Sequence, residues 1–404
     1  MLVKLAIRNL FRNKRRTLIT AASVFFAVFF AILMRSLQLG VYDNMINNIV
    51  GYYHGYAQVM HNDYWEESSL DNTLLYTDSL TDKLMQNPAV IEVLPRIQTY
   101  ALASAQQATK GVLVTGIQPE KEHHILNIQS KLIKGNYFAA NDQSVILGEK
   151  LAEFLNLNIN DTLILLGQGY QGAGAAGKFN VAGIARFSSP DLSNTLVCLP
   201  LKATQQMYAA EGRISYYILH GHRPNNIESN LSSINSSLPK NLTVKGWKEI
   251  LPELIQLIQA DNAAGKVALG ILYIIIGFGM FGTVLMMTTE RLYEFGVLIS
   301  IGMKRWKLIC IQVVEGIFVS FIGVITGAIF SIPVLLWFYN NPIHLGADLA
   351  DFGEKYNIEP VLHFSLAPEI FYMQALWVLA MAIVVNWYPV WKITTLKVVQ
   401  ALRA

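Results

Sequence analysis

The sequence contains little cysteine and little charge. Its 404 residues include 2 cysteines, and only 15% of the residues are Asp, Glu, Lys or Arg. Soluble globular domains carry about 25% charged residues, so this composition argues against an ordinary soluble protein. Two cysteines provide no disulfide framework and no cysteine-rich metal site. The formal net charge of +3 gives no reason to expect a nucleic-acid partner.

The chain also lacks the motifs of nucleotide, metal and nucleophilic chemistry. Its glycine-rich segment, 167–177, is followed by Lys178 and then by Phe179, whereas a phosphate-binding loop requires Ser or Thr after the lysine. We interpret this segment as the flexible tip of a hairpin. The adjacent pair His123 and His124 has no Cys or carboxylate at metal-ligand spacing. We therefore expect no catalytic residue, no cofactor and no metal, and we expect any ATPase to be a separate subunit.

Long apolar runs are the main feature that the sequence does contain. A helix of about 21 residues, at about 1.5 Å per residue, spans roughly 32 Å, which is close to the hydrocarbon thickness of a bilayer. Four runs reach this length. The sequence therefore predicts a membrane α-helical fold with a large α+β external domain, and with four transmembrane helices at residues 17–39, 263–288, 308–339 and 370–389.

Lys and Arg are distributed unevenly between the segments that flank these runs. Residues 1–16 carry six of them and no acid, 289–307 and 390–404 are also basic, and 340–369 has only Lys355. The positive-inside rule then places both termini and 289–307 in the cytoplasm. The alternative is a cleavable signal peptide at the N-terminus. It agrees less well, because the first apolar run is long and no A-x-A-like site follows it.

The segment 40–262, between the first two spans, is long enough to be a domain. Two β-α-β stretches, at about 50–115 and 202–250, suggest an α+β sandwich whose halves pair around an insertion. The insertion, at about 116–201, is β-rich, and we expect it to form a separate lobe. Apolar residues at helical spacing from Pro252 onward predict that the second span continues outward as a stalk.

The short charged segment between the second and third spans is the most informative part of the chain. Its charged residues fall within about one turn of a predicted helix, and its apolar residues form a second stripe before a glycine that would end the helix. These residues are Glu290, Arg291 and Glu294, then Val297, Leu298 and Ile301, then Gly302. We interpret 289–307 as an amphipathic helix at the cytoplasmic membrane face, on which a motor outside the bilayer acts. The alternative is an ordinary cytoplasmic loop.

Residues 290–302 resemble the Glu-Arg…Glu-x-Gly…Gly signature that follows the second transmembrane helix in permeases of the FtsX/MacB/LolC-LolE family. The end of the chain is also similar, because Pro389 follows the last span and residues 401–403 read Ala-Leu-Arg. The resemblance covers essentially the whole chain. It implies that an ATPase contacts a defined set of residues: Glu290, Arg291, Glu294, Gly296, Val297, Leu298, Gly302, Lys304 and Arg305.

The resemblance implies a permease subunit of an ABC transporter in the bacterial inner membrane. A separate ABC ATPase and a second permease subunit, identical or paralogous, would complete the transporter in the lipid bilayer. The absence of a fused ATPase and the large external domain favour the lipoprotein-releasing type, which passes lipoproteins to a periplasmic carrier. Two alternatives stay open. One is a MacB-like efflux or export permease that works with an adaptor and an outer-membrane channel, and the other is an FtsX-like activator of a cell-wall hydrolase.

Glycines and isolated charges inside the predicted spans give two further expectations. Gly316, Gly323 and Gly327 would let the third span approach another helix closely, either within the chain or in a second copy. Arg35 and Glu315 are the ionisable residues nearest to membrane depth. Because a charge at the bilayer centre costs at least about 2.5 kcal/mol, we expect both side chains to reach an interface.

Overall fold

The computed structural model describes residues 14–106, 108–122, 127–187, 189–344 and 361–398. The predictions for the first 13 residues, for His123 and His124, and for 399–404 therefore lie outside the described residues. The chain divides into two compact units. The helical unit comprises the described residues up to Asp43, Leu257–His344 and those from Val361 onward, and the α/β unit comprises Asn44–Gln256.

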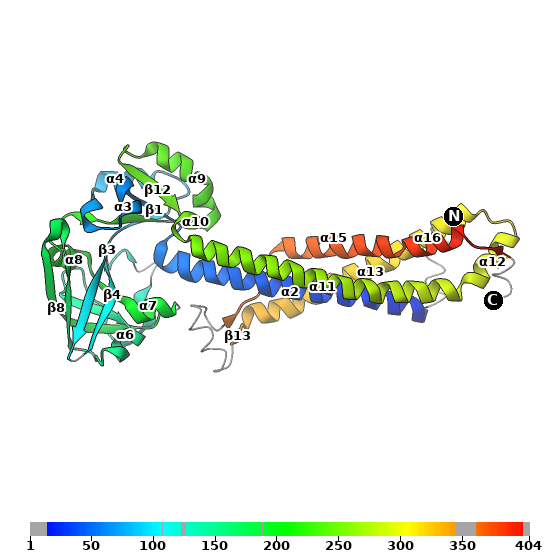
Figure 1. The fold of residues 1–404 in the computed structure, drawn as a ribbon, viewed down its shortest axis with the longest axis horizontal. Helices are drawn as coiled ribbons and strands as arrows, with labels where there is room; N and C mark the ends of the chain where they lie inside the picture. Colours follow the sequence, from blue (N-terminus) through cyan, green and yellow to red (C-terminus); the bar gives the residue numbers. More distant parts are fainter. Residues whose placement is uncertain (1–13, 107, 123–126, 188, 345–360, 399–404) are drawn as a thin grey trace. The chain divides into compact units, whose positions relative to one another are not determined.

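Four helices of the described chain are long and apolar enough to cross a membrane (Figure 1). They are α2 (Lys14–Met45), α11 (Pro252–Glu290), α13 (Arg305–Asn340) and α15 (Pro368–Val385), which α16 (Trp387–Thr394) continues after Asn386. Each helix occurs where an apolar run predicted one. α11 is longer than the predicted span and begins at Pro252, because residues at helical spacing continue beyond the apolar run.

Glycines of α13 allow two helices of the helical unit to pack closely. A Cβ at Gly323 would lie 2.7 Å from the carbonyl oxygen of Ala21 in α2, and one at Gly327 would lie 2.8 Å from that of Phe25. Gly316 packs in the same way against the side chain of Asn386. All three glycines therefore serve contacts within the chain, which was one of the two alternatives. Around them lies an apolar core that includes Val24, Val28, Ile32, Met280, Val324 and Val378.

Replacing Gly323 with leucine is expected to destabilise the helical unit. The new side chain would meet the α2 backbone, and overpacking of this kind costs about 1–3 kcal/mol. The control is Gly282→Leu in α11, because nothing lies within 4 Å of a Cβ built at Gly282. The midpoint of thermal unfolding of the full chain in detergent measures the effect. Equal midpoints for the two variants would show that α13 does not pack on α2 at this glycine.

The α/β unit is built on one sheet, which has ten strands among the described residues. The two predicted β-α-β stretches pair directly, since β1 lies between β11 and β12, and β11 pairs with β3. Their packing into one domain is therefore confirmed. The strands are β1 (Ala57–His61), β3 (Glu92–Ala105), β4 (Ala108–Ile117), β5 (Leu132–Gly135), β6 (Ser144–Gly148), β7 (Thr162–Gln168), β8 (Gly174–Ala185), β9 (Leu196–Pro200), β11 (Tyr216–His220) and β12 (Leu242–Gly246).

Short helices connect these strands. The two helices of the predicted β-α-β stretches are α4 (Asp78–Met85) and α9 (Pro224–Ser237), and both form where capping and periodicity indicated a helix. Others lie between strands of the insertion or just after it, among them α6 (Glu149–Phe154), α7 (Pro190–Thr195) and α8 (Leu201–Met207). Figure 1 shows these helices beside the strands that they connect.

Residues 116–201 contribute β5 to β9, and these strands are connected to the β-α-β stretches through the long strand β3, so their separation as a lobe stays a prediction. β3 is long, so its first part pairs with β11 and its second part pairs with β4 and β7. From β4 the pairing continues through β9, β6, β8 and β7 back to β3. These six strands form a closed ring, and the long strand β3 joins the ring to the rest of the sheet.

The glycine-rich segment forms the end of a hairpin in this ring, as predicted. β7 and β8 pair antiparallel from Thr162 with Asn180 to Gln168 with Gly174. At the turn, Gln171 has a φ of +53° and Gly172 a φ of +75°, a left-handed conformation that glycine adopts without strain. The tip is shorter than expected, since residues 174–177 already belong to β8.

A buried arginine ties the end of the first long helical segment to the sheet of the α/β unit. The π-helical segment η1 (Ile46–His54) follows α2, and the Nη1 of Arg96 in β3 donates a hydrogen bond to the carbonyl oxygen of Tyr53 at its end. Two further nitrogens of Arg96 donate to the Glu122 carboxylate at 2.7 and 2.8 Å, and both side chains are fully buried. We call Arg96, Glu122 and the Tyr53 carbonyl the Arg96 anchor.

Burial and neighbouring charges shift the pKa values of Arg96 and of the adjacent His54. Burial alone would lower the pKa of the Arg96 guanidinium, but the Glu122 carboxylate outweighs that effect and raises it. Burial lowers the pKa of the neighbouring His54 to about 4, and the positive charge of Arg96 acts in the same direction. At neutral pH the His54 imidazole beside the Arg96 anchor is therefore neutral.

Candidate motor-coupling site

The segment predicted as one coupling helix is divided among three helices. α11 ends at Glu290, α12 (Leu292–Ser300) follows, and α13 begins at Arg305. Gly302 has a φ of +102°, so it adopts the left-handed conformation that ends α12, as its position indicated. The prediction of a helix over 289–307 is therefore corrected to a nine-residue helix joined to two long ones.

Arg291 lies inside the helical unit and pairs with a carboxylate of α13. Its Nη1 donates to the two carboxylate oxygens of Glu315 at 2.8 and 2.9 Å, and to the Gln312 oxygen at 3.4 Å. Both charged side chains are almost completely buried, with exposed fractions of 6% and 5%. The prediction that Arg291 belongs to a charged stripe on the surface is wrong, because its side chain is buried. Its Nε lies 3.5 Å from the Oε2 of Glu294, which is the neighbouring residue of that stripe. The expectation that Glu315 reaches a membrane interface stays a prediction, and within the bundle Arg291 supplies its counter-charge.

The buried apolar face of α12 differs from the predicted one. Phe295 is 2% exposed and Leu298 packs beside it, whereas Ile301 is 79% exposed. The reason is that α12 begins at Leu292, so residues 292, 295 and 299 lie on one face, and Ile301 is the residue that ends the helix. The partners of this face come from α13 and from the region of α16: Leu308, Ile393 and Leu396.

Arg305 connects the start of α13 to the end of α16. Its guanidinium donates to the carbonyl oxygen of Leu396 at 2.8 Å and to that of Thr394. A cation at the C-terminal end of a helix satisfies unpaired carbonyls and interacts favourably with the helix dipole. Arg305 was predicted to contact an ATPase. Its contacts in this chain hold two helices together, and Lys304 remains exposed beside it.

The site therefore has a fixed interior and an exposed tip. The interior contains Arg291, Phe295, Gly296 and, in part, Leu298, and it includes residues that the sequence analysis did not assign to it: Gln312, Leu308, Ile393 and Leu396. Glu315 was recognised only as an isolated charge. A sequence signal for the pair existed, because a carboxylate in an apolar run needs a nearby cation. The exposed tip consists of Glu290, Tyr293, Ile301, Lys304 and Trp306.

This arrangement packs α12 against neighbouring helices of the helical unit. The buried face of α12 contacts α13 and the α16 region, and only Arg291 separates its first residue from the end of α11. The ion pair of Arg291 with Glu315 links this junction to α13, and Arg305 links α13 to the end of α16. A force applied at the exposed tip would therefore act on α11, α13 and α16 together.

Two family models match the chain. The FtsX-like permease C-terminal model matches residues 266–398, and the MacB-like periplasmic core domain model matches residues 17–233, which is more than half of the chain. The chain belongs to the FtsX/MacB family of ABC-transporter permeases. Proteins of this family are membrane components of ABC transporters.

Curated relatives of this FtsX/MacB-family chain include lipoprotein-releasing system transmembrane proteins LolC. The protein from Xylella fastidiosa (strain Temecula1) is 20% identical over 341 residues, which cover 79% of each chain. The protein from Neisseria meningitidis serogroup B is 19% identical over 268 residues, covering 64% of this chain and 65% of the relative.

Solved structures similar to this chain include the periplasmic region of MacB from Actinobacillus actinomycetemcomitans, with 13% identity and a TM-score of 0.36. That match covers 53% of this chain and 98% of the other. A second is the extracellular domain of YknZ from Gram-positive bacteria, with 11% identity and a TM-score of 0.33, covering 47% of this chain and 98% of the other.

Proposed function

We propose that this permease transmits the work of a separate cytoplasmic ABC ATPase to the α/β unit, and that this work releases lipoproteins from the inner membrane to a periplasmic carrier. The buried pair of Arg291 with Glu315 is the main observation that supports transmission, because it joins α12 to α13 at the end of α11. The similarity to LolC over 79% of the chain supports lipoproteins as the cargo.

We further propose that both termini and α12 lie in the cytoplasm and that the α/β unit lies in the periplasm. The uneven distribution of Lys and Arg supports this orientation. α11 then provides the route for movement across the bilayer. It is continuous over 39 residues, which at about 1.5 Å per residue is roughly 58 Å. A second permease subunit would complete the transporter.

The proposal predicts that truncating two exposed residues of the tip weakens ATPase binding. In the variant Tyr293→Ala with Ile301→Ala, both side chains are more than half exposed, so the chain should remain stable. Large apolar and aromatic residues dominate binding at interfaces, so affinity for the ATPase should fall at least about tenfold. The measurement is co-purification of the ATPase with the permease, followed by the rate of ATP hydrolysis in liposomes.

The matched control is Tyr100→Ala with Leu102→Ala, which truncates two exposed residues of β3 in the α/β unit. ATPase retention should be unaffected by this control. If the tip variant retains as much ATPase as the wild type, α12 is not part of the contact with the ATPase. The cargo is tested separately, by ATP-dependent transfer of a lipid-anchored protein from liposomes to a soluble carrier. Normal ATPase stimulation without such transfer would contradict lipoprotein release and favour an export or signalling role.

A further inference from the structure

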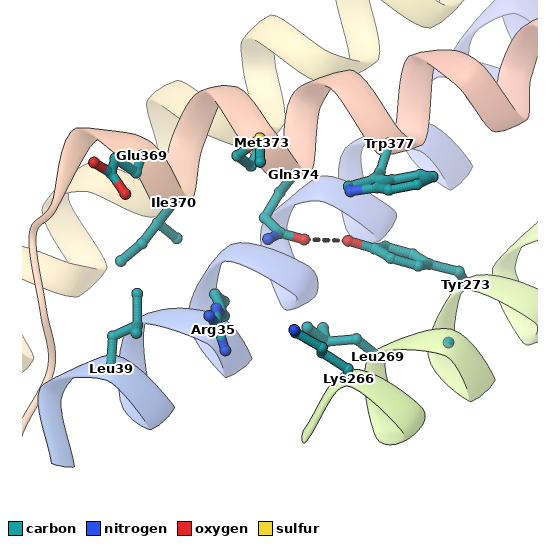
Figure 2. A pocket seen from close by; sticks show the side chains of 11 residues that line it. Arg35, Leu39, Lys266, Leu269, Tyr273, Glu369, Ile370, Met373, Gln374 and Trp377 are labelled. Carbon is teal, nitrogen blue, oxygen red and sulfur yellow. Dashed lines mark hydrogen bonds between the residues drawn. The ribbon is translucent and has the colours of Figure 1, made fainter. Parts of the chain in front are cut away.

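A cavity of about 470 Å³ lies within the helical unit, between α2, α11 and α15. Figure 2 shows side chains from all three helices on its walls, with the hydrogen-bonded pair Tyr273 and Gln374 at one side. Most of the lining is apolar, and its charged residues are Arg35, Lys266 and Glu369. The principal lining residues are Arg35, Leu39, Lys266, Leu269, Ile370 and Met373.

The charged residues of the cavity mark one boundary of the apolar layer. Arg35 follows the uncharged run 17–34, Lys266 precedes the uncharged run 267–289, and Glu369 precedes the uncharged run 370–391. Each run is close to the length that crosses a hydrocarbon core. On α11 the opposite boundary is at Glu290, next to α12. The cavity therefore lies where lipid headgroups meet acyl chains, at the membrane face opposite α12.

The two cations of the cavity have neutral partners or none among the described residues. Arg35 donates to the amide oxygens of Gln38 at 2.6 Å and Asn262 at 2.8 Å. Lys266 is exposed, and no ion pair in the described part of the chain includes it. Figure 2 shows Glu369 at the other end of the cavity from Lys266. The lining therefore carries a net positive charge beside an apolar groove, which is complementary to an anionic amphiphile.

The groove has room for an acyl chain. A Cβ built at Gly270 meets nothing within 4 Å, so this position leaves the wall of the groove open. Ile370 and Met373 provide apolar surface on the opposite helix, and the amide of Gln374 is occupied by the Tyr273 hydroxyl. Trp377 is 55% exposed at the same site, and an amphipathic ring of this kind is favoured at the level of lipid headgroups.

We propose that this cavity binds one anionic phospholipid of the outer leaflet. Its phosphate lies between Arg35 and Lys266, and one acyl chain follows the groove past Gly270. The site lies at the boundary where α2 and α11 leave the apolar layer, so a bound lipid joins these two helices to α15 on one side of the membrane. The choice of leaflet rests on the orientation proposed above, and the inference does not depend on lipoprotein release or on a partner ATPase.

The test measures binding of phosphatidylglycerol to the purified full chain by native mass spectrometry in detergent, without any ATPase or lipoprotein. Wild-type protein should retain phosphatidylglycerol at least about tenfold more strongly than phosphatidylethanolamine. Arg35→Gln with Lys266→Gln should abolish that preference. Gly270→Leu keeps both cations but fills the groove, so it should weaken binding of both lipids.

Two controls make the outcome specific. Lys307→Gln with Lys392→Gln removes two positive charges from the α12 end of the helical unit, and Gly282→Leu adds the same side chain to an open position of α11. Both should leave phosphatidylglycerol binding unchanged. Equal retention of the two lipids by the wild type would overturn the proposal. The proposal would also be overturned if inorganic phosphate displaced phosphatidylglycerol and Gly270→Leu bound phosphatidylglycerol normally. Those two results together would identify a phosphate site without a lipid groove.

Discussion

Glu315→Leu is expected to destabilise the helical unit by about 3–5 kcal/mol, because it leaves the Arg291 guanidinium buried without a counter-charge. If the pair transmits force as proposed, stimulation of the ATPase should fall as well. The midpoint of thermal unfolding in detergent and the rate of ATP hydrolysis with the reconstituted ATPase measure the two effects. The control is Glu253→Leu at the exposed start of α11, which should cost less than about 1 kcal/mol.

A double variant separates stability from transmission. Arg291→Met with Glu315→Leu removes both buried charges, and apolar replacement of a whole buried pair is often neutral or stabilising. We expect thermal stability to recover in this variant. If coupling remains impaired at normal stability, the ion pair acts in transmission. If Glu315→Leu alone is as stable as the wild type, the buried pair described here is wrong.

Arg96→Met is expected to destabilise the α/β unit by about 3–5 kcal/mol and to release the end of η1. The substitution leaves the Glu122 carboxylate buried and unpaired and removes the donor to the Tyr53 carbonyl oxygen. Hydrogen exchange of the amides of residues 46–55 in the full chain should therefore become faster. The matched control is Arg186→Met, because the pair of Arg186 with Glu149 has an arginine that is 67% exposed and should contribute less than about 1 kcal/mol.

The two partners of Arg96, the Glu122 carboxylate and the Tyr53 carbonyl oxygen, are expected to affect different measurements. Arg96→Met with Glu122→Leu should regain most of the stability, because no buried charge remains. The Tyr53 carbonyl oxygen still lacks its donor in this variant, so fast exchange in η1 should persist. Slow exchange in the double variant would show that the ion pair alone, and not the bond to Tyr53, holds this segment.

The helices and most strands could be predicted because their signals are local. Uncharged runs of membrane length specify α2, α11, α13 and α15. An apolar and aromatic run specifies β11, and alternation specifies β12. Ring closure could not be predicted, because it depends on β7 pairing with β3, about sixty residues away. The sharing of β3 between the two parts of the sheet could not be predicted for the same reason, since nothing local in 116–201 indicates which strand its own strands pair with.

The sequence located the helices that flank the candidate site, but it did not predict the contacts in the interior of the site. The signature residues do lie between α11 and α13, yet Arg291 points inward because its partner, Glu315, comes from the next helix. The same limit applies to the glycines. Gly323 and Gly282 are equivalent as residues in apolar runs, but one contacts the α2 backbone and the other contacts nothing within 4 Å. A periodic pattern identifies a helix face, and only the tertiary fold decides what covers it.

The closed ring of the α/β unit restricts how an unfolded polypeptide could be held. An extended segment binds most readily by adding a strand to a sheet edge that has unpaired backbone groups. The six ring strands have sheet neighbours on both sides over much of their length, whereas β5 and β12 each pair with a single strand among the described residues. Strand addition in this sheet would be directed to its two ends, and a client that reaches the ring itself would have to be recognised through side chains.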